Sequence, residues 1–95
     1  KGLVPCIVQS SGNNDVLMLA WMTKETLIKT IDSGYATYWS RSRGEIWIKG
    51  QSSGNKQKVN EIMIDCDKDC ILLKVDQKGV ACHTGEWSCF FNRLH

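Results

Sequence analysis

The sequence predicts a small α+β domain, rich in β-strands, with one main helix and either a small mixed sheet or a pseudo-barrel. Most of the chain consists of apolar or alternating segments of strand length. Only residues 23–34 carry the start and stop signals of a helix. With 95 residues, 42% of them hydrophobic, the chain can form one modest core and is too short for two. We therefore expect one domain over residues 1–95.

The chain begins with two predicted strands. They are residues 3–9 (LVPCIVQ) and residues 16–21 (VLMLAW). The segment SSGNND at 10–15 lies between them and carries the Gly and Asn residues that tight turns use. These features predict two strands joined by a short turn.

A helix is expected over residues 23–34 (TKETLIKTIDSG). Thr23 is a suitable N-cap because its side-chain oxygen can accept from a free N–H of the first turn. Gly34 can end the helix in the left-handed conformation. The apolar stripe expected on this helix consists of Leu27, Ile28 and Ile31.

Four further segments alternate or run apolar at strand length, with Gly-containing or charged breaks between them. They are residues 35–40 (YATYWS), 45–50 (EIWIKG), 58–66 (KVNEIMIDC) and 70–75 (CILLKV). There is no repeat, linker or low-complexity tract. The strands therefore dominate the predicted domain.

Charge is unevenly distributed along the chain. The formal net charge of +2 is too small to make the whole protein a polyanion binder. Residues 41–58 are locally basic and residues 61–69 locally acidic, a combination that suits a phosphorylated ligand and a cation or is simply a solvated surface. No apolar run approaches the roughly 20 residues of a membrane span, and no signal peptide is visible. We expect a cytoplasmic protein without a membrane partner.

The segment MIDCDKDC at 63–70 alternates acids with thiols. If the preceding strand continues, Asp65, Asp67 and Asp69 lie on one face, about 7 Å apart, where ionised carboxylates repel. A hard cation would compensate, and magnesium is the candidate if a phosphate supplies further oxygens. The alternative is a charged turn without function. A calcium loop is disfavoured because Cys70 stands where its sharp turn needs glycine and the lead-in resembles a strand.

The five cysteines argue for metal binding or burial rather than a disulfide framework, since their number is odd and no secretory signal is seen. Cys82 and Cys89 alone could be buried apolar residues. Together with Cys66, they could hold zinc and leave a fourth position for water, which would ionise near neutral pH. His83 is a candidate base or proton shuttle, or an ordinary hydrogen-bonded histidine.

Four segments, in this order and spacing, resemble the phosphoribosyl-AMP cyclohydrolase family of histidine biosynthesis. They are VLMLAWM (16–22), YWSRSRGEIWIKGQSSGN (38–55), IDCDKD (64–69) and ACHTGEWSCF (81–90). The resemblance covers about Leu3 to Phe90 and implies hydrolytic opening of the adenine ring of phosphoribosyl-AMP. The bond broken would join the alkylated ring nitrogen to the carbon that bears the exocyclic amine. The product would be a formimino-aminoimidazole carboxamide ribonucleotide.

The resemblance also implies a ligand set and an assembly. By matching position, the zinc ligands would be Cys66, Cys82 and Cys89. The magnesium ligands would be Asp65, Asp67 and Asp69. The family forms an intertwined homodimer with shared zinc sites, in which one subunit gives the residue matching Cys66 and the other gives the remaining pair.

Residue types within the family segment suggest the substrate contacts. Arginine can bind a phosphate with two parallel hydrogen bonds, and lysine can face it as a point charge. Serine can donate from its hydroxyl, and glycine from its backbone N–H. Tryptophan could stack on the base or belong to the core. The expected contact residues are Trp39, Arg41, Arg43, Trp47, Lys49, Ser52, Ser53 and Gly54.

Two functions from other classes compete with this hypothesis. A non-catalytic zinc-binding nucleic-acid module would also contain cysteines, tryptophans and a basic segment, but three carboxylates beside the thiols would repel a phosphate backbone. A zinc-dependent deaminase is disfavoured because its His-x-Glu and Pro-Cys-x-x-Cys signature is absent. Cys6 and Cys70 are expected to be packing residues, although Cys70 could compete for zinc. We expect no nucleic-acid partner.

Overall fold

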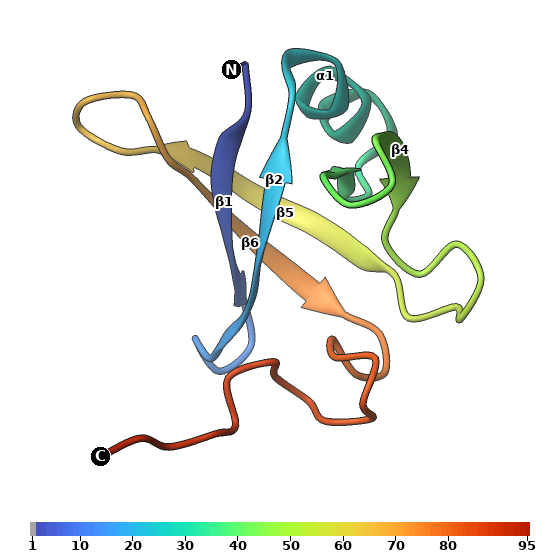
Figure 1. Cartoon of the computed structure of the whole chain (residues 1–95), viewed down its shortest axis with the longest axis vertical. Coiled ribbons are helices and arrows are strands. Elements are labelled where there is room, and N and C mark those ends of the chain that lie inside the picture. The colour runs from blue at the N-terminus through green and yellow to red at the C-terminus, as the bar shows by residue number, and fades with distance from the viewer. Residues whose placement is uncertain (1) are drawn as a thin grey trace.

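A computed structural model describes residues 2–95 and contains, over that range, six strands and one helix (Figure 1). The elements follow in the order β1 (Val4–Ser10), β2 (Val16–Met22), α1 (Lys24–Ser33), β3 (Thr37–Ser40), β4 (Glu45–Ile48), β5 (Gln57–Ile64) and β6 (Ile71–Gln77). This β-rich arrangement with one helix confirms the predicted class.

The strands form two separate sheets. The larger has the order β2-β1-β6-β5, in which β1 and β6 are parallel and the other pairs antiparallel. The smaller is the antiparallel pair of β3 and β4. Across residues 2–95 neither sheet closes, so of the two predicted arrangements the small mixed sheet is observed and the pseudo-barrel is not.

The core lies between the large sheet and the layer formed by α1 with β3 and β4 (Figure 1). Alternate residues of the central strands point into it, as the period of two requires. The side chains without any exposed surface include Cys6, Val8, Leu17, Met22, Tyr38, Leu73 and Val75. The expected packing role of Cys6 is confirmed.

Helix α1 begins and ends where the sequence predicts. The Thr23 hydroxyl accepts from the N–H of Thr26 at 3.1 Å, and the Thr26 hydroxyl accepts from the N–H of Thr23 at 2.9 Å. Gly34 adopts φ 80° and donates its N–H to the Thr30 carbonyl, a left-handed C-terminal cap that favours glycine. No helix within residues 2–95 is long and apolar enough to cross a membrane.

The predicted apolar stripe on α1 was wrong in part. Leu27 packs against the core, but Ile28 and Ile31 are 47% and 59% exposed. The helix instead buries Thr26 and Thr30. The Thr30 hydroxyl accepts, at 3.0 Å, from the N–H of the first residue of β3 and donates to the Thr26 carbonyl. These buried polar contacts set the rotation of the helix on β3.

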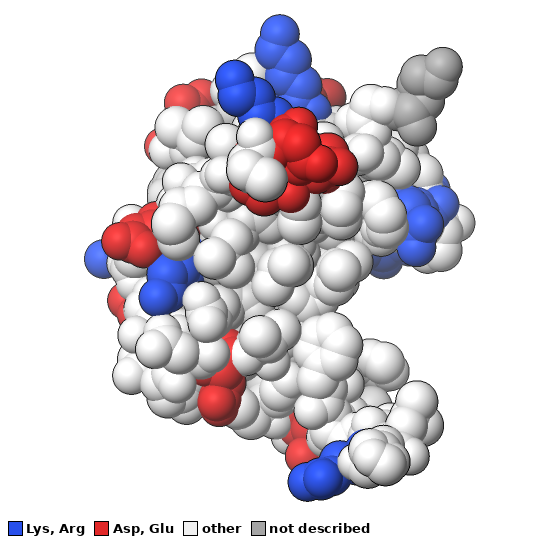
Figure 2. Space-filling model, turned by 90° about the vertical axis from the view of Figure 1, so that its left-hand side faces the viewer, with Lys and Arg blue, Asp and Glu red and all other residues white. Residues whose placement is uncertain are grey.

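An apolar row crosses the face of the large sheet that points away from the core. It follows the strand register from Leu19 to Ile7, then to Leu72 and Met63. Its two ends are 48% and 42% exposed. Figure 2, which views the molecule from the side away from α1, shows a broad surface without Lys, Arg, Asp or Glu. An antiparallel sheet face turned to water normally carries polar side chains, so this face is a candidate contact surface.

Candidate metal and substrate site

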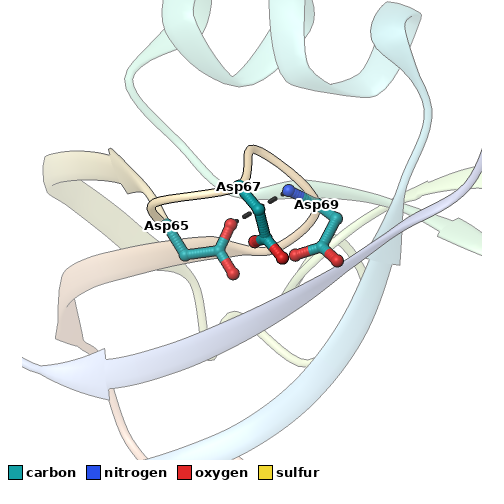
Figure 3. Close-up of side chains that lie close together, drawn as sticks. All are labelled: Asp65, Asp67 and Asp69. Atoms are coloured by element: carbon teal, nitrogen blue, oxygen red, sulfur yellow. Dashed lines mark hydrogen bonds between the residues drawn. The ribbon is translucent and has the colours of Figure 1, made fainter.

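The three aspartates lie in the turn between β5 and β6, not on a strand face. Strand β5 ends at Ile64, and the chain reverses through Lys68, whose φ is 63°. The predicted strand over the acidic segment is therefore wrong, because the hairpin closes before it. The turn still brings the carboxylates of Asp65, Asp67 and Asp69 together, with one oxygen of each within 4.8 Å of the others (Figure 3).

Asp65 organises this turn through its own side chain. Its Oδ1 accepts from the N–H of Asp69 at 2.9 Å and from that of Cys70 at 3.0 Å. Its backbone N–H donates to the Cys70 carbonyl at 3.0 Å. Aspartate commonly bonds nearby backbone groups in turns, so turn formation alone explains Asp65. It does not explain why Asp67 and Asp69 also point toward it in Figure 3.

Crowding of the carboxylates changes their pKa values. Desolvation raises the pKa of Asp65, but the hydrogen bonds from Asp69 and Cys70 outweigh it, and the pKa lies below its usual value. The pKa of Asp69 rises to about 6 because its carboxyl hydrogen-bonds to those of Asp67 and Asp65 and faces their negative charge. Asp69 therefore keeps its proton to a higher pH than an isolated carboxylate does.

The donor set of this turn fits a hard divalent cation. Magnesium prefers carboxylate oxygens at about 2.1 Å in an octahedron, whose opposite ligands lie about 4.2 Å apart. Neighbouring ligands of that octahedron lie about 3.0 Å apart, so the three oxygens, which lie within 4.8 Å of one another, would move closer on binding. All three carboxylates are exposed, which leaves room for water or a phosphate in the remaining positions.

A second cluster lies in the segment after β6. The thiols of Cys82 and Cys89 lie close enough for each to influence the pKa of the other. The Thr84 hydroxyl donates to Cys82 Sγ at 3.0 Å and is the largest cause that lowers the pKa of Cys82. Burial and the neighbouring Cys82 raise the pKa of Cys89. The two pKa values shift in opposite directions, and two neighbouring thiols are candidates for two of the four ligands of a tetrahedral zinc site.

Backbone bonds close the loop that carries this pair. Ala81 donates its N–H to the Trp87 carbonyl at 3.0 Å, and Cys82 donates to the Glu86 carbonyl at 3.2 Å. The N–H of Cys89 donates to the Leu17 carbonyl at 2.7 Å, which ties the end of the loop to β2. The two thiols therefore stand on a defined loop rather than on a free tail. His83 lies between them in sequence and is exposed.

The structure does not bring Cys66 to the other two candidate zinc ligands. Cys66 lies in the turn before β6, whereas Cys82 follows the end of β6. That strand has seven residues and spans more than about 20 Å at 3.3 Å per residue. Figure 1 shows the turn and the C-terminal segment at opposite ends of β6. Within residues 2–95 the metal-sized cluster of three ligands consists of the aspartates alone.

All five cysteines are free, as the absence of a disulfide framework predicts. Cys70 is half-buried in the aspartate turn. Desolvation, followed by the charges of the three neighbouring aspartates, raises the pKa of its thiol. It is therefore disfavoured as a thiolate ligand.

Five of the predicted substrate residues share one groove of about 310 Å³ beside β4. They are Arg43, Trp47, Lys49, Ser52 and Ser53. The Arg43 guanidinium is paired with Glu45, Nε to Oε2, at 3.4 Å. Trp47 also packs on the core, with its ring centroid 5.3 Å from that of Tyr38. A place in the core was the alternative to stacking on the substrate base.

The other three predicted substrate residues do not line that groove. The Arg41 guanidinium lies 4.3 Å over the Trp21 ring. Trp39 is half-buried in β3, opposite Ile46 of β4. Gly54 lines a separate cavity of about 470 Å³ together with several lysines.

Sequence reasoning missed the contact between Lys49 and the thiol loop. Lys49 Nζ donates to the Ala81 carbonyl at 2.7 Å. Burial lowers the pKa of Lys49, while the nearby Cys89 and Cys82 oppose that shift. The partners are 32 residues apart, and no local pattern links them.

Comparison with known proteins identifies a family. The family model for phosphoribosyl-AMP cyclohydrolase matches residues 18–91. Three curated relatives of that name come from Herminiimonas arsenicoxydans, Janthinobacterium sp. (strain Marseille) and Hyphomonas neptunium. They are 60%, 59% and 57% identical to the chain over 94 residues. These alignments cover 98%, 98% and 99% of the chain, and 70%, 70% and 72% of the respective relatives.

Proposed function

This chain belongs to the phosphoribosyl-AMP cyclohydrolase family, and we propose that it is a zinc-dependent enzyme that opens the adenine ring of phosphoribosyl-AMP by hydrolysis. The product is the formimino-aminoimidazole carboxamide ribonucleotide, formed in a step of histidine biosynthesis in the cytoplasm. The carrying observation is that the chain, 60% identical to a cyclohydrolase, holds Cys82 and Cys89 side by side. Residues 1–95 then form one cyclohydrolase domain.

Zinc is assigned to the thiols of Cys66, Cys82 and Cys89. Zinc prefers thiolate and imidazole ligands, and a site with three protein ligands keeps a position for water. When bound, it would supply a nucleophilic water near neutral pH. The adjacent thiol pair and the lowered pKa of Cys82 support this assignment, because a thiolate rather than a thiol is the ligand.

The zinc site is completed by a second copy of the chain. Cys66 stands more than about 20 Å along β6 from Cys82, so one chain cannot supply all three ligands without refolding. A homodimer in which each subunit gives Cys66 to its partner's thiol pair resolves this separation. The exposed apolar row from Leu19 to Met63 supports an interface on the open sheet face.

Magnesium is assigned to Asp65, Asp67 and Asp69. Magnesium in enzymes commonly uses one or two carboxylates together with substrate phosphates. Cys66 belongs to the same turn, so this cation would lie beside the zinc ligand that the subunit donates. It would offset the repulsion between a phosphorylated substrate and the three carboxylates.

The reaction adds one water and breaks one ring bond. Alkylation leaves the purine ring electron-poor, so water can add to the carbon that bears the exocyclic amine. The ring nitrogen then leaves, the ring opens, and the exocyclic nitrogen remains as the carboxamide. His83, exposed beside Cys82, would accept the proton of the attacking water and deliver a proton to the departing ring nitrogen.

The groove beside β4 is assigned to the substrate. Arg43 can face phosphate there, and the hydroxyls of Ser52 and Ser53 can donate to it. Lys49 also lines the groove, but its ammonium is hydrogen-bonded to the Ala81 carbonyl. Trp47 offers an aromatic face at the same groove. The proposed set also contains three residues outside this groove, Trp39, Arg41 and Gly54. A conformational change on substrate binding would have to bring them to the ligand.

Mass spectrometry of phosphoribosyl-AMP incubated with zinc-loaded protein tests this function, with ammonia assayed alongside. We expect the substrate to gain the mass of one water and to release no ammonia. Cys82→Ser should lose the reaction because it removes a zinc ligand. Cys70→Ser is the matched control, since it removes a thiol that is not among the proposed zinc ligands, and should retain activity.

An unchanged substrate, with folding and metal content verified, would contradict the proposed activity. Release of ammonia without ring opening would indicate deaminase chemistry instead. Salt-sensitive binding of RNA or DNA without turnover would favour the nucleic-acid module.

A further inference from the structure

Lys49 connects β4 to the loop that carries the thiol pair. Its backbone N–H donates to the Ala36 carbonyl at 3.1 Å, which fixes the base of the side chain beside the small sheet. Its ammonium reaches across to the Ala81 carbonyl at 2.7 Å. A hydrogen bond from a charged donor is stronger than one between neutral groups. This side chain therefore joins two parts of the chain that share no strand pairing.

The bond acts on the peptide unit that leads into Cys82. The carbonyl of Ala81 and the N–H of Cys82 belong to the same planar group. Lys49 holds the carbonyl from one side, and the Glu86 carbonyl accepts the N–H from the other at 3.2 Å. A planar group held at both ends fixes the position of the Cys82 Cα. The Lys49 ammonium therefore sets the point from which the Cys82 side chain starts, and the Thr84 hydroxyl contacts the thiol itself.

The same ammonium also lies near both thiols. Its electrostatic partners are Cys89 and Cys82, and it is half-buried, where screening by water is reduced. Two neighbouring thiolates repel each other, and a fixed cation beside them lowers that cost. Lys49 thus contributes both a position and a charge to the pair.

We propose that Lys49 is a positioning residue that orients the Cys82–Cys89 loop for metal binding. The inference rests on the zinc site of the proposed function and assigns the Lys49 ammonium to the Ala81 carbonyl rather than to a substrate phosphate. Its main effect is on metal affinity and on the order of the loop. Substrate affinity then depends on the other side chains of the groove.

Lys49→Met tests this role, because methionine keeps an apolar stem and loses the donor and the charge. Lys24→Met is the matched control, since Lys24 is an exposed lysine of α1 outside the proposed site. Hydrogen exchange is measured on the metal-free proteins, and zinc affinity by competition with a chromophoric chelator. Steady-state kinetics at saturating zinc then separate KM for phosphoribosyl-AMP from kcat.

We expect Lys49→Met to speed exchange of the Cys82 amide by about 10-fold or more, since its peptide unit loses a charge-assisted bond. Zinc affinity should fall about 10- to 100-fold, as is common when a group that orients a metal ligand is removed. The KM should change by less than about 2-fold while kcat falls. Lys49→Arg should restore most of the affinity and the slow exchange, and Lys24→Met should match the wild type.

If hydrogen exchange and zinc affinity of Lys49→Met match those of the wild type while its KM rises, the inference is overturned. Lys49 would then contact the substrate phosphate instead. If Lys49→Met does not fold, Lys49→Gln provides the comparison, because its neutral amide should give a smaller change in the same direction. Wild-type protein that binds no zinc contradicts the proposed function. Wild-type and Lys49→Met proteins that bind zinc equally overturn only the role of Lys49.

Discussion

Complementation between two inactive variants tests whether the zinc site is shared. Cys66→Ser and Cys82→Ser each remove one proposed ligand, and each protein alone should be inactive. In a mixed dimer, the Cys66→Ser subunit still offers Cys82 and Cys89, and the Cys82→Ser subunit still offers Cys66. One of the two sites is then complete. The other site contains both substitutions and stays inactive.

The expected recovery follows from the separation of the ligands in one chain. After free exchange of equal amounts, about half of the dimers are mixed, and each has one complete site of two, so activity should reach about a quarter of the wild-type value. A site formed within one chain would give no recovery, because neither variant has all three thiols. The distance of more than about 20 Å along β6 is the reason to expect recovery.

The assay is turnover of phosphoribosyl-AMP after partial unfolding and joint refolding of the two variants with zinc. Mixed dimers are verified by native mass spectrometry with one variant isotopically labelled. A mixture of Cys82→Ser and Cys89→Ser is the control, since both changes fall on the same half of the site and no mixed dimer is complete. Mixed dimers that form without activity would refute the shared site.

Three further predictions concern the stability of the fold. Burial, with a smaller effect of Cys70, raises the pKa of Cys6 from 9.0 to about 12, so between these values the unfolded chain has lost a proton that the folded chain keeps. The free energy of unfolding of the wild type should therefore fall, relative to that of Cys6→Ala, by about 1.4 kcal/mol per pH unit above pH 9. Urea titrations of both proteins under reductant measure this, and the same dependence of the free energy of unfolding on pH in both would contradict it. Gly50→Ala should destabilise the protein by more than about 2 kcal/mol, because φ is 80° and the added Cβ would collide with the backbone of Asn55; an unchanged urea midpoint would argue against the tight approach of these two segments. Tyr38→Phe should cost about 1–3 kcal/mol in thermal unfolding, because the buried Tyr38 hydroxyl donates to Gln57 Oε1, and a loss well below that range would mean that this acceptor finds another donor.

Local patterns explain why the elements could be predicted from the sequence. The hydroxyl of Thr23 and the left-handed conformation open to Gly34 act within a turn of their own residues, so α1 begins and ends as expected. Alternation of apolar residues likewise located the strands. The face that α1 buries was mispredicted because Thr30 bonds to a strand that follows the helix, which hydrophobicity does not encode.

The acidic segment forms the turn that was the alternative to a continued strand, and its carboxylates still lie together. A continued strand would have placed the carboxylates on one face, whereas the hairpin turn draws Asp65, Asp67 and Asp69 together through the backbone bonds of Asp65. Both arrangements concentrate negative charge. The cation proposed for this segment follows from that charge and not from the backbone path.

The class of the fold, the ends of its helix and the family can be predicted from the sequence alone, because they depend on residues that are near in the chain or on motifs that stay in order. Which of the candidate side chains lie close together depends on the tertiary structure. Cys66 and Cys82 are 16 residues apart and are separated by the length of β6, while Lys49 and Ala81 are 32 apart and are hydrogen-bonded. Separation along the chain does not set separation in space once strands reverse direction and loops pack across them. Which thiols share a metal is therefore a property of packing.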